Sequence, residues 1–215
     1  QTFNGPARVS GSAGTGKTVV ALHRVAHILK SEPAAKILLT TFSDPLANAL
    51  KSKLKMLVPN EADLDNKVTI LPFEGVAYDL FTLAEGFNPR PAKRKNIAAA
   101  LKEAVKLLNT EGFSDRFFLS EWLHVVDAWQ LMSLEEYSNV PRLGRKSRLG
   151  SKQRERIWPV FLKTRELLVA QGIYSWPSIF GKVTDYYKDR DHKPFTHIIV
   201  DEAQDLGVPE LRMLS

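Results

Sequence analysis

Residues 11–18 read Gly11-Ser12-Ala13-Gly14-Thr15-Gly16-Lys17-Thr18 and match the pattern GxxxxGK[ST] in this 215-residue chain. Glycines in this pattern allow backbone conformations that aim successive N–H groups at phosphate oxygens. A helix predicted to start at the loop adds the positive end of its dipole. Lys17 is expected to reach the β- and γ-phosphates, and the Thr18 hydroxyl to ligate magnesium. The stretch therefore predicts a nucleotide-binding loop with ATP and Mg²⁺ as its ligands.

Strand and helix patterns alternate over residues 1–84. Asp44 is expected to cap the second helix, with Pro45 at its first position. Strands that alternate with helices predict an α/β fold, a doubly wound parallel sheet with helices on both faces. The predicted strands are Ala7–Ser10, Lys36–Thr41, Lys67–Leu71 and, much later, Thr196–Val200. The predicted helices of this part are Lys17 to about Leu29, Asp44 to about Leu57, and a third that follows Pro72 to about Ala84.

Residues 85–190 show helical periodicity and no strand pattern. This part is also basic, with 19 Lys and Arg against 12 Asp and Glu, which favours a polyanionic partner. We expect one α/β core, residues 1–84 and 191–215, interrupted by a mostly α-helical inserted subdomain at residues 85–190. The helices predicted in the insertion are Asn96–Leu108, Leu119–Leu131, Lys152–Ala170 and Trp176–Tyr187.

A second acidic motif, Asp201-Glu202-Ala203-Gln204-Asp205, follows the apolar strand that ends at Val200. In a P-loop enzyme, a strand near the loop delivers an aspartate to the magnesium ion. Asp201 fits this role, since ligands of open α/β sheets bind at the carboxyl ends of the strands. Glu202 can polarise the attacking water as a general base. The predicted catalytic residues are therefore Lys17 and Glu202, and the predicted metal ligands are Thr18 and Asp201.

The two motifs together resemble those of the superfamily 1 DNA helicases of the UvrD/Rep type. Gln204 is the sharper signal, because glutamine in that place is typical of this superfamily, and the resemblance adds it to the nucleotide site. The likeness covers essentially the whole chain and implies a first RecA-like, ATP-binding domain with a helical insertion. It also implies ATP hydrolysis coupled to translocation on single-stranded DNA and to strand separation, an activity used in DNA repair.

The resemblance also implies DNA contacts. Thr41-Phe42 are similar to the family's first DNA-contacting motif, in which an aromatic ring stacks on a base. Phe73 is what remains of a second such motif. A basic loop extends the set: from Arg142 to Arg156 there are seven basic residues and one acid, which suits sequence-independent contacts with phosphates. The arginines expected to touch single-stranded or partly duplex DNA are Arg142, Arg145 and Arg148.

The composition and the two ends of the sequence limit the kinds of bond, metal site and cellular location that we expect. There is no cysteine, so disulfides and thiolate metal sites are excluded. No apolar run approaches about 18 residues and no signal peptide is evident, so we expect a cytoplasmic protein with no membrane segment. The sequence stops at Ser215, before the second RecA-like domain that the family has. The resemblance therefore implies a piece of a longer helicase, nearly inactive in isolation.

Two other functions remain open at this point. A P-loop kinase would phosphorylate a small molecule held in a pocket of the insertion. A nucleotide-dependent switch or scaffold would bind a protein through the insertion and turn over little ATP. Gln204 argues against the kinase, and DNA binding by the basic loop would argue against the switch.

Overall fold

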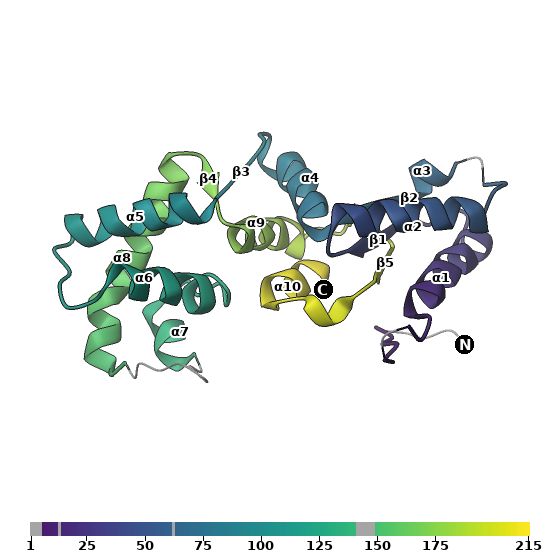
Figure 1. Ribbon diagram of the computed structural model, residues 1–215. Helices are drawn as coiled ribbons and strands as arrows, with labels where there is room; N and C mark the ends of the chain where they lie inside the picture. The colour runs from purple at the N-terminus through teal and green to yellow at the C-terminus, as the bar shows by residue number, and fades with distance from the viewer. Residues whose placement is uncertain (1–5, 13, 62, 141–148) are drawn as a thin grey trace. The chain divides into compact units, whose positions relative to one another are not determined.

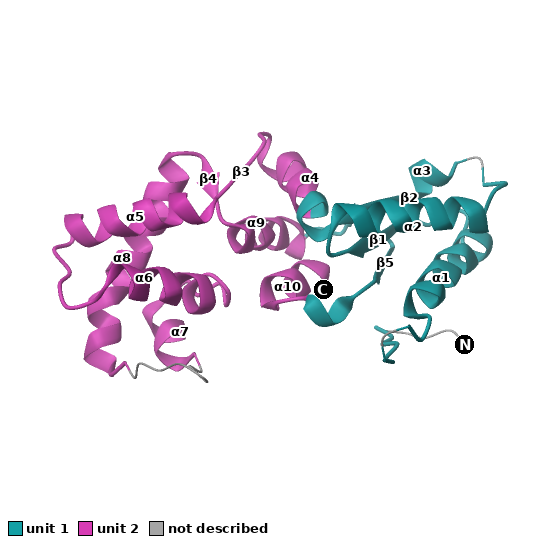
Figure 2. Cartoon of the chain, in the orientation of Figure 1, with its two compact units in different colours: residues 1–76, 190–205 teal, residues 77–189, 206–215 magenta. Residues whose placement is uncertain are grey.

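The computed structural model describes residues 6–12, 14–61, 63–140 and 149–215. The chain forms two compact units (Figure 2). Unit 1 consists of residues 1–76 and 190–205, and unit 2 of residues 77–189 and 206–215. The chain therefore passes from one unit to the other three times, and each unit is assembled from two separate segments.

Unit 1 is built on a three-stranded parallel sheet with the strand order β2–β1–β5 (Figure 1). The central strand β1 is buried along its whole length. Thr41 lies opposite Pro72, and Thr40 lies opposite Val200, so the carboxyl ends of all three strands meet at one edge. The strands are β1 (Ile37–Thr41), β2 (Val68–Pro72) and β5 (His197–Val200).

Apolar side chains join the helices of unit 1 to this sheet. Leu22 and Val25 of α1 and Leu54 of α2 share one core cluster with Ile37 and Leu39 of β1. The mixed α/β class and the parallel sheet are thereby confirmed, although a larger RecA-like sheet is not present among the described residues. The helices of this part are α1 (Lys17–Ser31), α2 (Asp44–Leu57), α3 (Leu64–Lys67) and α4 (Phe73–Glu85), which begins directly after β2.

Two local predictions for unit 1 are wrong. Ala7–Ser10 forms no strand: its residues are exposed, Val9 to 56 %, and none of them pairs with the sheet. A strand needs a neighbour for its N–H and C=O groups, and this segment has none. The cap of α2 is Ser43 rather than Asp44, which is the first helical residue. There its charge still favours the positive end of the helix dipole.

Unit 2 is mostly helical, and aromatic residues fill its core. Phe118, Trp122, Tyr137 and Phe161 are buried to 1 % exposure or less. The helices are α5 (Arg94–Leu107), α6 (Asp115–Glu121), the π-helical turn η1 (Trp122–Val126), α7 (Leu134–Asn139), α8 (Ser151–Ala170), α9 (Trp176–Lys188) and α10 (Val208–Leu214).

The insertion differs from its prediction in two places. The single helix expected at Leu119–Leu131 breaks into α6 and η1, followed by a turn in which Gln130 adopts φ 52°. Two short strands, β3 (Arg90–Pro91) and β4 (Ile173–Tyr174), pair in parallel, although no strand was expected in this part. Strands of two residues are too short to leave a period-2 pattern in the sequence.

The boundaries of the compact units depart from the predicted domain boundaries. Unit 2 begins inside α4, at Ala77, and it includes residues 206–215. The predicted core contained both of these segments. The predicted division into residues 1–84 with 191–215 and residues 85–190 stays a proposal about domains.

Candidate active site

The glycine-rich loop leads directly into α1. Gly16 is the N-cap of α1 and has φ 83°, and Gly14 has φ 79°. This left-handed region is costly for residues with a Cβ, which explains glycine at both positions. No side chain caps α1, and its first turn holds no acid. The first backbone N–H groups of the helix, which have no partner within it, are therefore suited to an anion.

Lys17 folds back over the loop that precedes it. Its Nζ donates hydrogen bonds to the carbonyl oxygens of Gly11, at 3.1 Å, and Ser12, at 3.0 Å. Thr15 Oγ1 donates to the same Ser12 carbonyl at 2.8 Å, and a Cβ at Gly11 would lie 2.5 Å from Thr15 Oγ1. An ammonium group has three donors, so two are used within the loop and one stays available for a phosphate oxygen.

Thr18 and Asp201 meet at the carboxyl edge of the sheet. Thr18 Oγ1 donates a hydrogen bond to Asp201 Oδ2 at 2.9 Å. Asp201 is buried, at 6 % exposure, and its backbone N–H donates to the Thr40 carbonyl at 2.9 Å, which extends the pairing of β5 with β1. A hydroxyl and a carboxylate are the hard oxygen ligands that Mg²⁺ prefers, so these residues fit the predicted metal site.

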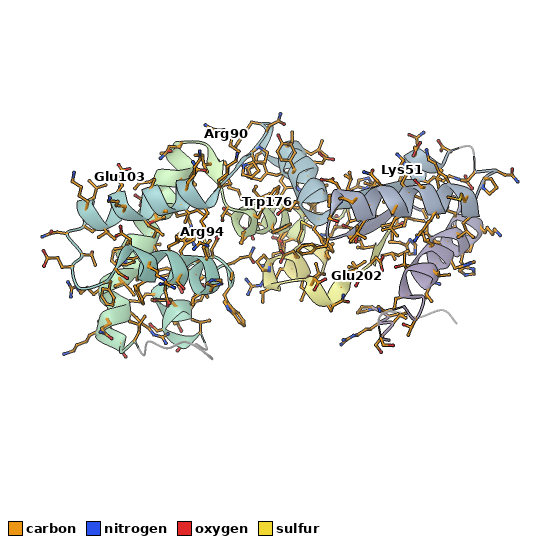
Figure 3. All side chains as sticks on the ribbon, in the orientation of Figure 1. Lys51, Arg90, Arg94, Glu103, Trp176 and Glu202 are labelled. Carbon is orange, nitrogen blue, oxygen red and sulfur yellow. The ribbon has the colours of Figure 1, made fainter. Side chains whose placement is uncertain are left out.

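Glu202 follows Asp201 in a rare conformation. Its φ is 60°, in the left-handed region, and Figure 3 shows it on the segment that leaves β5. The 3₁₀ turn η2 (Ala203–Asp205) begins at the next residue, and the Asp205 N–H donates to the Glu202 carbonyl at 3.2 Å. Gln204 Nε2 donates a hydrogen bond to Glu202 Oε2. Backbone strain of this kind clusters at functional sites, because the surrounding structure has to hold it in place.

The residues predicted to contact DNA differ in their exposure to solvent. Phe42 is 61 % exposed at the end of β1, so its ring is free to stack. Thr41 is buried, and its Oγ1 has no hydrogen-bond partner among the described residues. Phe73 is only 3 % exposed, which favours core packing over contact with a base. Arg142, Arg145 and Arg148 lie outside the described residues, as does Ala13 of the glycine-rich loop.

Sequence reasoning missed one residue that supports this site. Thr40 is fully buried at the carboxyl end of β1. Its Oγ1 donates to the Leu71 carbonyl at 2.9 Å, and its own carbonyl accepts the Asp201 N–H. Thr40 thereby connects β1 to β2 and fixes the backbone that carries the acidic motif. A polar residue within an apolar strand, one position before the predicted Thr41-Phe42 motif, was the available signal.

A glycine-rich loop at the start of α1, a parallel sheet and an acidic strand end lie together within unit 1, an arrangement that suits phosphate binding. The chain belongs to the family of the UvrD/REP helicase N-terminal domain, whose family model matches residues 1–215. Helicases of this family use ATP and Mg²⁺ and act on DNA. Comparison with curated proteins gave no match.

No helix in the described ranges is long and apolar enough to cross a membrane. In the same part of the chain, no three His, Cys, Asp or Glu side chains are grouped so as to hold a metal ion. Mg²⁺ commonly takes only one or two carboxylates together with substrate phosphates, so the pairing of Thr18 with Asp201 suits this ion without such a group.

Proposed function

We propose that this chain is the ATP-binding first motor domain of a DNA helicase, which hydrolyses ATP to move along single-stranded DNA and to separate strands. The hydrogen bond between Thr18 and Asp201 carries this proposal, because it closes the glycine-rich loop on the acidic motif. A chance glycine-rich turn would not find a buried carboxylate from the far end of the chain beside its hydroxyl.

Each residue of the site has a separate chemical task. The N–H groups at the start of α1 and the Lys17 ammonium bind phosphate oxygens and offset their negative charge. Thr18 Oγ1 and an Asp201 carboxylate oxygen would hold Mg²⁺, which when bound neutralises charge on the β- and γ-phosphates. The Glu202 carboxylate accepts a proton from the attacking water. Gln204, whose Nε2 donates a hydrogen bond to Glu202 Oε2, would contact the nucleotide.

The DNA side of the proposal rests on exposure and charge. Phe42 presents an apolar ring at the same sheet edge that carries the acidic motif, and stacking on such a ring tolerates any base. The basic loop that contains Arg142, Arg145 and Arg148 supplies positive charge for phosphates. Neutralising these three arginines in the full-length protein should weaken DNA binding and flatten its salt dependence.

Full activity needs a second RecA-like domain of the same longer chain. That domain would supply arginines at the transferring phosphate, and such residues contribute factors of about 10³–10⁵ in rate. The 215 residues alone should therefore bind nucleotide and hydrolyse it slowly.

The test compares ATP hydrolysis with and without single-stranded DNA in the full-length protein, in a Lys17→Ala variant and in a Lys30→Ala control. Lys30 is exposed in the last turn of the same helix, so its loss should change little. We expect DNA to stimulate the wild type and the control, and the Lys17→Ala variant to be inactive. Equal, DNA-independent rates in all three proteins would exclude the helicase, whereas hydrolysis that needs Lys17 but ignores DNA would favour a kinase or a switch.

A further inference from the structure

Thr41, at the carboxyl end of β1, carries a buried hydroxyl group that makes no hydrogen bond with any described residue. The residue is completely buried, and its Oγ1 has no partner. The preceding Thr40 is buried to the same degree, but its Oγ1 donates to the Leu71 carbonyl at 2.9 Å. A buried hydroxyl without a partner destabilises a protein, because it has lost its hydrogen bonds with water and gained none. Such a group calls for a partner, which a bound ligand, water or ion can supply.

The Thr41 side chain lies on the face of the sheet that α1 covers. Side chains alternate between the two faces of a strand, so Thr41 shares a face with Ile37 and Leu39. Both of these residues belong to the core cluster that contains Leu22 and Val25 of α1. The hydroxyl of Thr41 therefore lies on the same side of the sheet as the helix that begins at the glycine-rich loop.

Asp201 is the neighbour of Thr41 on the adjacent strand. Thr40 lies opposite Val200, and the Asp201 N–H donates to the Thr40 carbonyl at 2.9 Å, so the next position of the register sets Thr41 beside Asp201. Adjacent strands are about 4.8 Å apart. The carboxylate of Asp201 is on the face that α1 covers, because it accepts a hydrogen bond from Thr18 Oγ1 at 2.9 Å. The unpartnered hydroxyl therefore lies beside the proposed Mg²⁺ ligands.

We infer that Thr41 is a positioning residue of the nucleotide site: its hydroxyl binds a water molecule in the coordination shell of the Mg²⁺ that Thr18 and Asp201 would hold. This role rests on the proposed ATP-binding function. Mg²⁺ gives up its waters reluctantly and usually keeps several of them beside one or two carboxylates and the substrate phosphates. A threonine hydroxyl accepts hydrogen bonds as well as donating one, so it can orient such a water. Full burial favours this role of Thr41 over the contact with DNA that the family resemblance implies.

The melting temperature of the ligand-free protein shows whether the hydroxyl has a partner within the fold. Thr41→Val keeps the shape of the side chain and removes only the hydroxyl. Because this change eliminates an unsatisfied buried group, Tm should not fall and should rise by up to about 4 °C. The same exchange at Thr40 breaks its hydrogen bond to Leu71 and should lower Tm. The two neighbouring threonines are therefore expected to respond with opposite sign.

The second measurement is the binding of a fluorescent ATP analogue to the full-length protein, with and without Mg²⁺. We expect Thr41→Val to weaken Mg²⁺-dependent binding by about tenfold, since groups that orient metal ligands contribute about 10- to 100-fold, and to leave Mg²⁺-free binding within about twofold. Thr41→Ser keeps the hydroxyl and should bind within about threefold of the wild type. Thr69→Val makes the same exchange on β2, opposite Leu38 and away from the carboxyl edge, and should bind as the wild type does.

Three results would overturn this role of Thr41. The first is a Thr41→Val variant that binds the Mg²⁺ complex as tightly as the wild type. The second is an equal loss of affinity with and without Mg²⁺. The third is a Tm of ligand-free Thr41→Val that falls as it does in Thr40→Val, because the hydroxyl would then have a structural partner. A wild type that binds no nucleotide at all would instead remove the proposed function.

Discussion

Thr18 Oγ1 donates a hydrogen bond to Asp201 Oδ2 over 2.9 Å, although the two residues are 183 positions apart in the chain. The chain reaches Asp201 only after residues 77–189 of the helical unit, and β5 then enters the sheet beside β1. Parallel pairing carries the carboxyl end of β5 to the edge where Thr18 lies in the first turn of α1. The candidate metal site is therefore a product of sheet topology and not of local sequence.

Replacing Thr18 by Val keeps its shape and removes its hydroxyl. We expect the affinity for Mg²⁺-ATP to fall by about 10- to 100-fold, because one metal ligand and the donor to Asp201 are both lost. Thr18→Ser retains the hydroxyl and should bind within a fewfold of the wild type. Isothermal titration with ATP, with and without Mg²⁺, measures both. Unchanged Mg²⁺-dependent binding by Thr18→Val would exclude Thr18 as a ligand.

Replacing Glu202 by Gln keeps the size of the side chain and removes its ability to accept a proton. We expect hydrolysis to slow by about 10²- to 10⁴-fold, the usual contribution of a general base, while ATP binding is retained. Single-turnover kinetics and a fluorescent nucleotide separate the two quantities. Loss of binding in parallel with hydrolysis would show that Glu202 holds the nucleotide instead.

Phe42 and Phe73 form a matched pair, the first 61 % and the second 3 % exposed. Phe42→Ala should weaken single-stranded DNA binding by about 1–3 kcal/mol, the value of one stacked base, with little change in Tm. Phe73→Ala should destabilise the fold by about 3–5 kcal/mol through a core cavity. Fluorescence anisotropy with an oligonucleotide and thermal unfolding check both variants. A Phe42→Ala variant with normal DNA affinity contradicts the stacking role.

Asp127 makes the stability of unit 2 depend on pH. Burial raises its pKa from 3.8 to about 6, although the hydrogen bond from Ser175, at 2.7 Å, and the nearby Arg165 oppose the rise. Between these two values the folded protein binds more protons at Asp127 than the unfolded chain does. The contribution of Asp127 to the free energy of unfolding therefore falls as the pH rises from 3.8 to about 6. The fall is about 3 kcal/mol at most, and the contribution is constant at higher pH.

Asp127→Asn is the control for this pH dependence, because it keeps an acceptor for Ser175 and has no proton to lose. Urea titrations at several pH values between about 4 and 7 should show the wild type losing stability relative to the variant as pH rises. Parallel pH profiles for the two proteins would mean that Asp127 has an ordinary pKa in the folded state.

The sequence predicted those elements that depend on local patterns. The bounds of α2, expected from Asp44 to about Leu57, are confirmed. Pro45 and the spacing of the buried residues Leu50 and Leu54 are local signals that are enough to specify this helix. The prediction of a strand at Ala7–Ser10 is wrong, because an apolar-leaning run becomes a strand only when a neighbouring strand pairs with it. The change from α6 to the π-helical turn η1 after Glu121 was also not predicted, because the apolar spacing of this stretch fits one continuous helix.

In the candidate site, too, some features follow from local sequence and others depend on the rest of the fold. Glycines with positive φ and an acidic strand end leave direct traces in the sequence, so Gly14, Gly16 and Asp201 could be singled out. The backbone strain at Glu202 could not be predicted, because glutamate rarely adopts φ 60° and the adjacent residues give no sequence signal for a positive φ. The burial of Phe73 was equally hidden, since an aromatic residue after a strand suits a core as well as a surface.

The assembly of unit 2 from two separate segments has a consequence for anyone who wishes to shorten or transplant it. Joining residue 76 to residue 190 would remove α9 and leave α10 behind. Arg212 would then lose its contact with Gln130, and the side of α10 that packs against α9 would be exposed. Grafting residues 77–189 onto another protein would expose the complementary side of α9. The helical unit therefore cannot be removed as one continuous segment, and evolution could exchange it only together with α10, which follows the acidic motif.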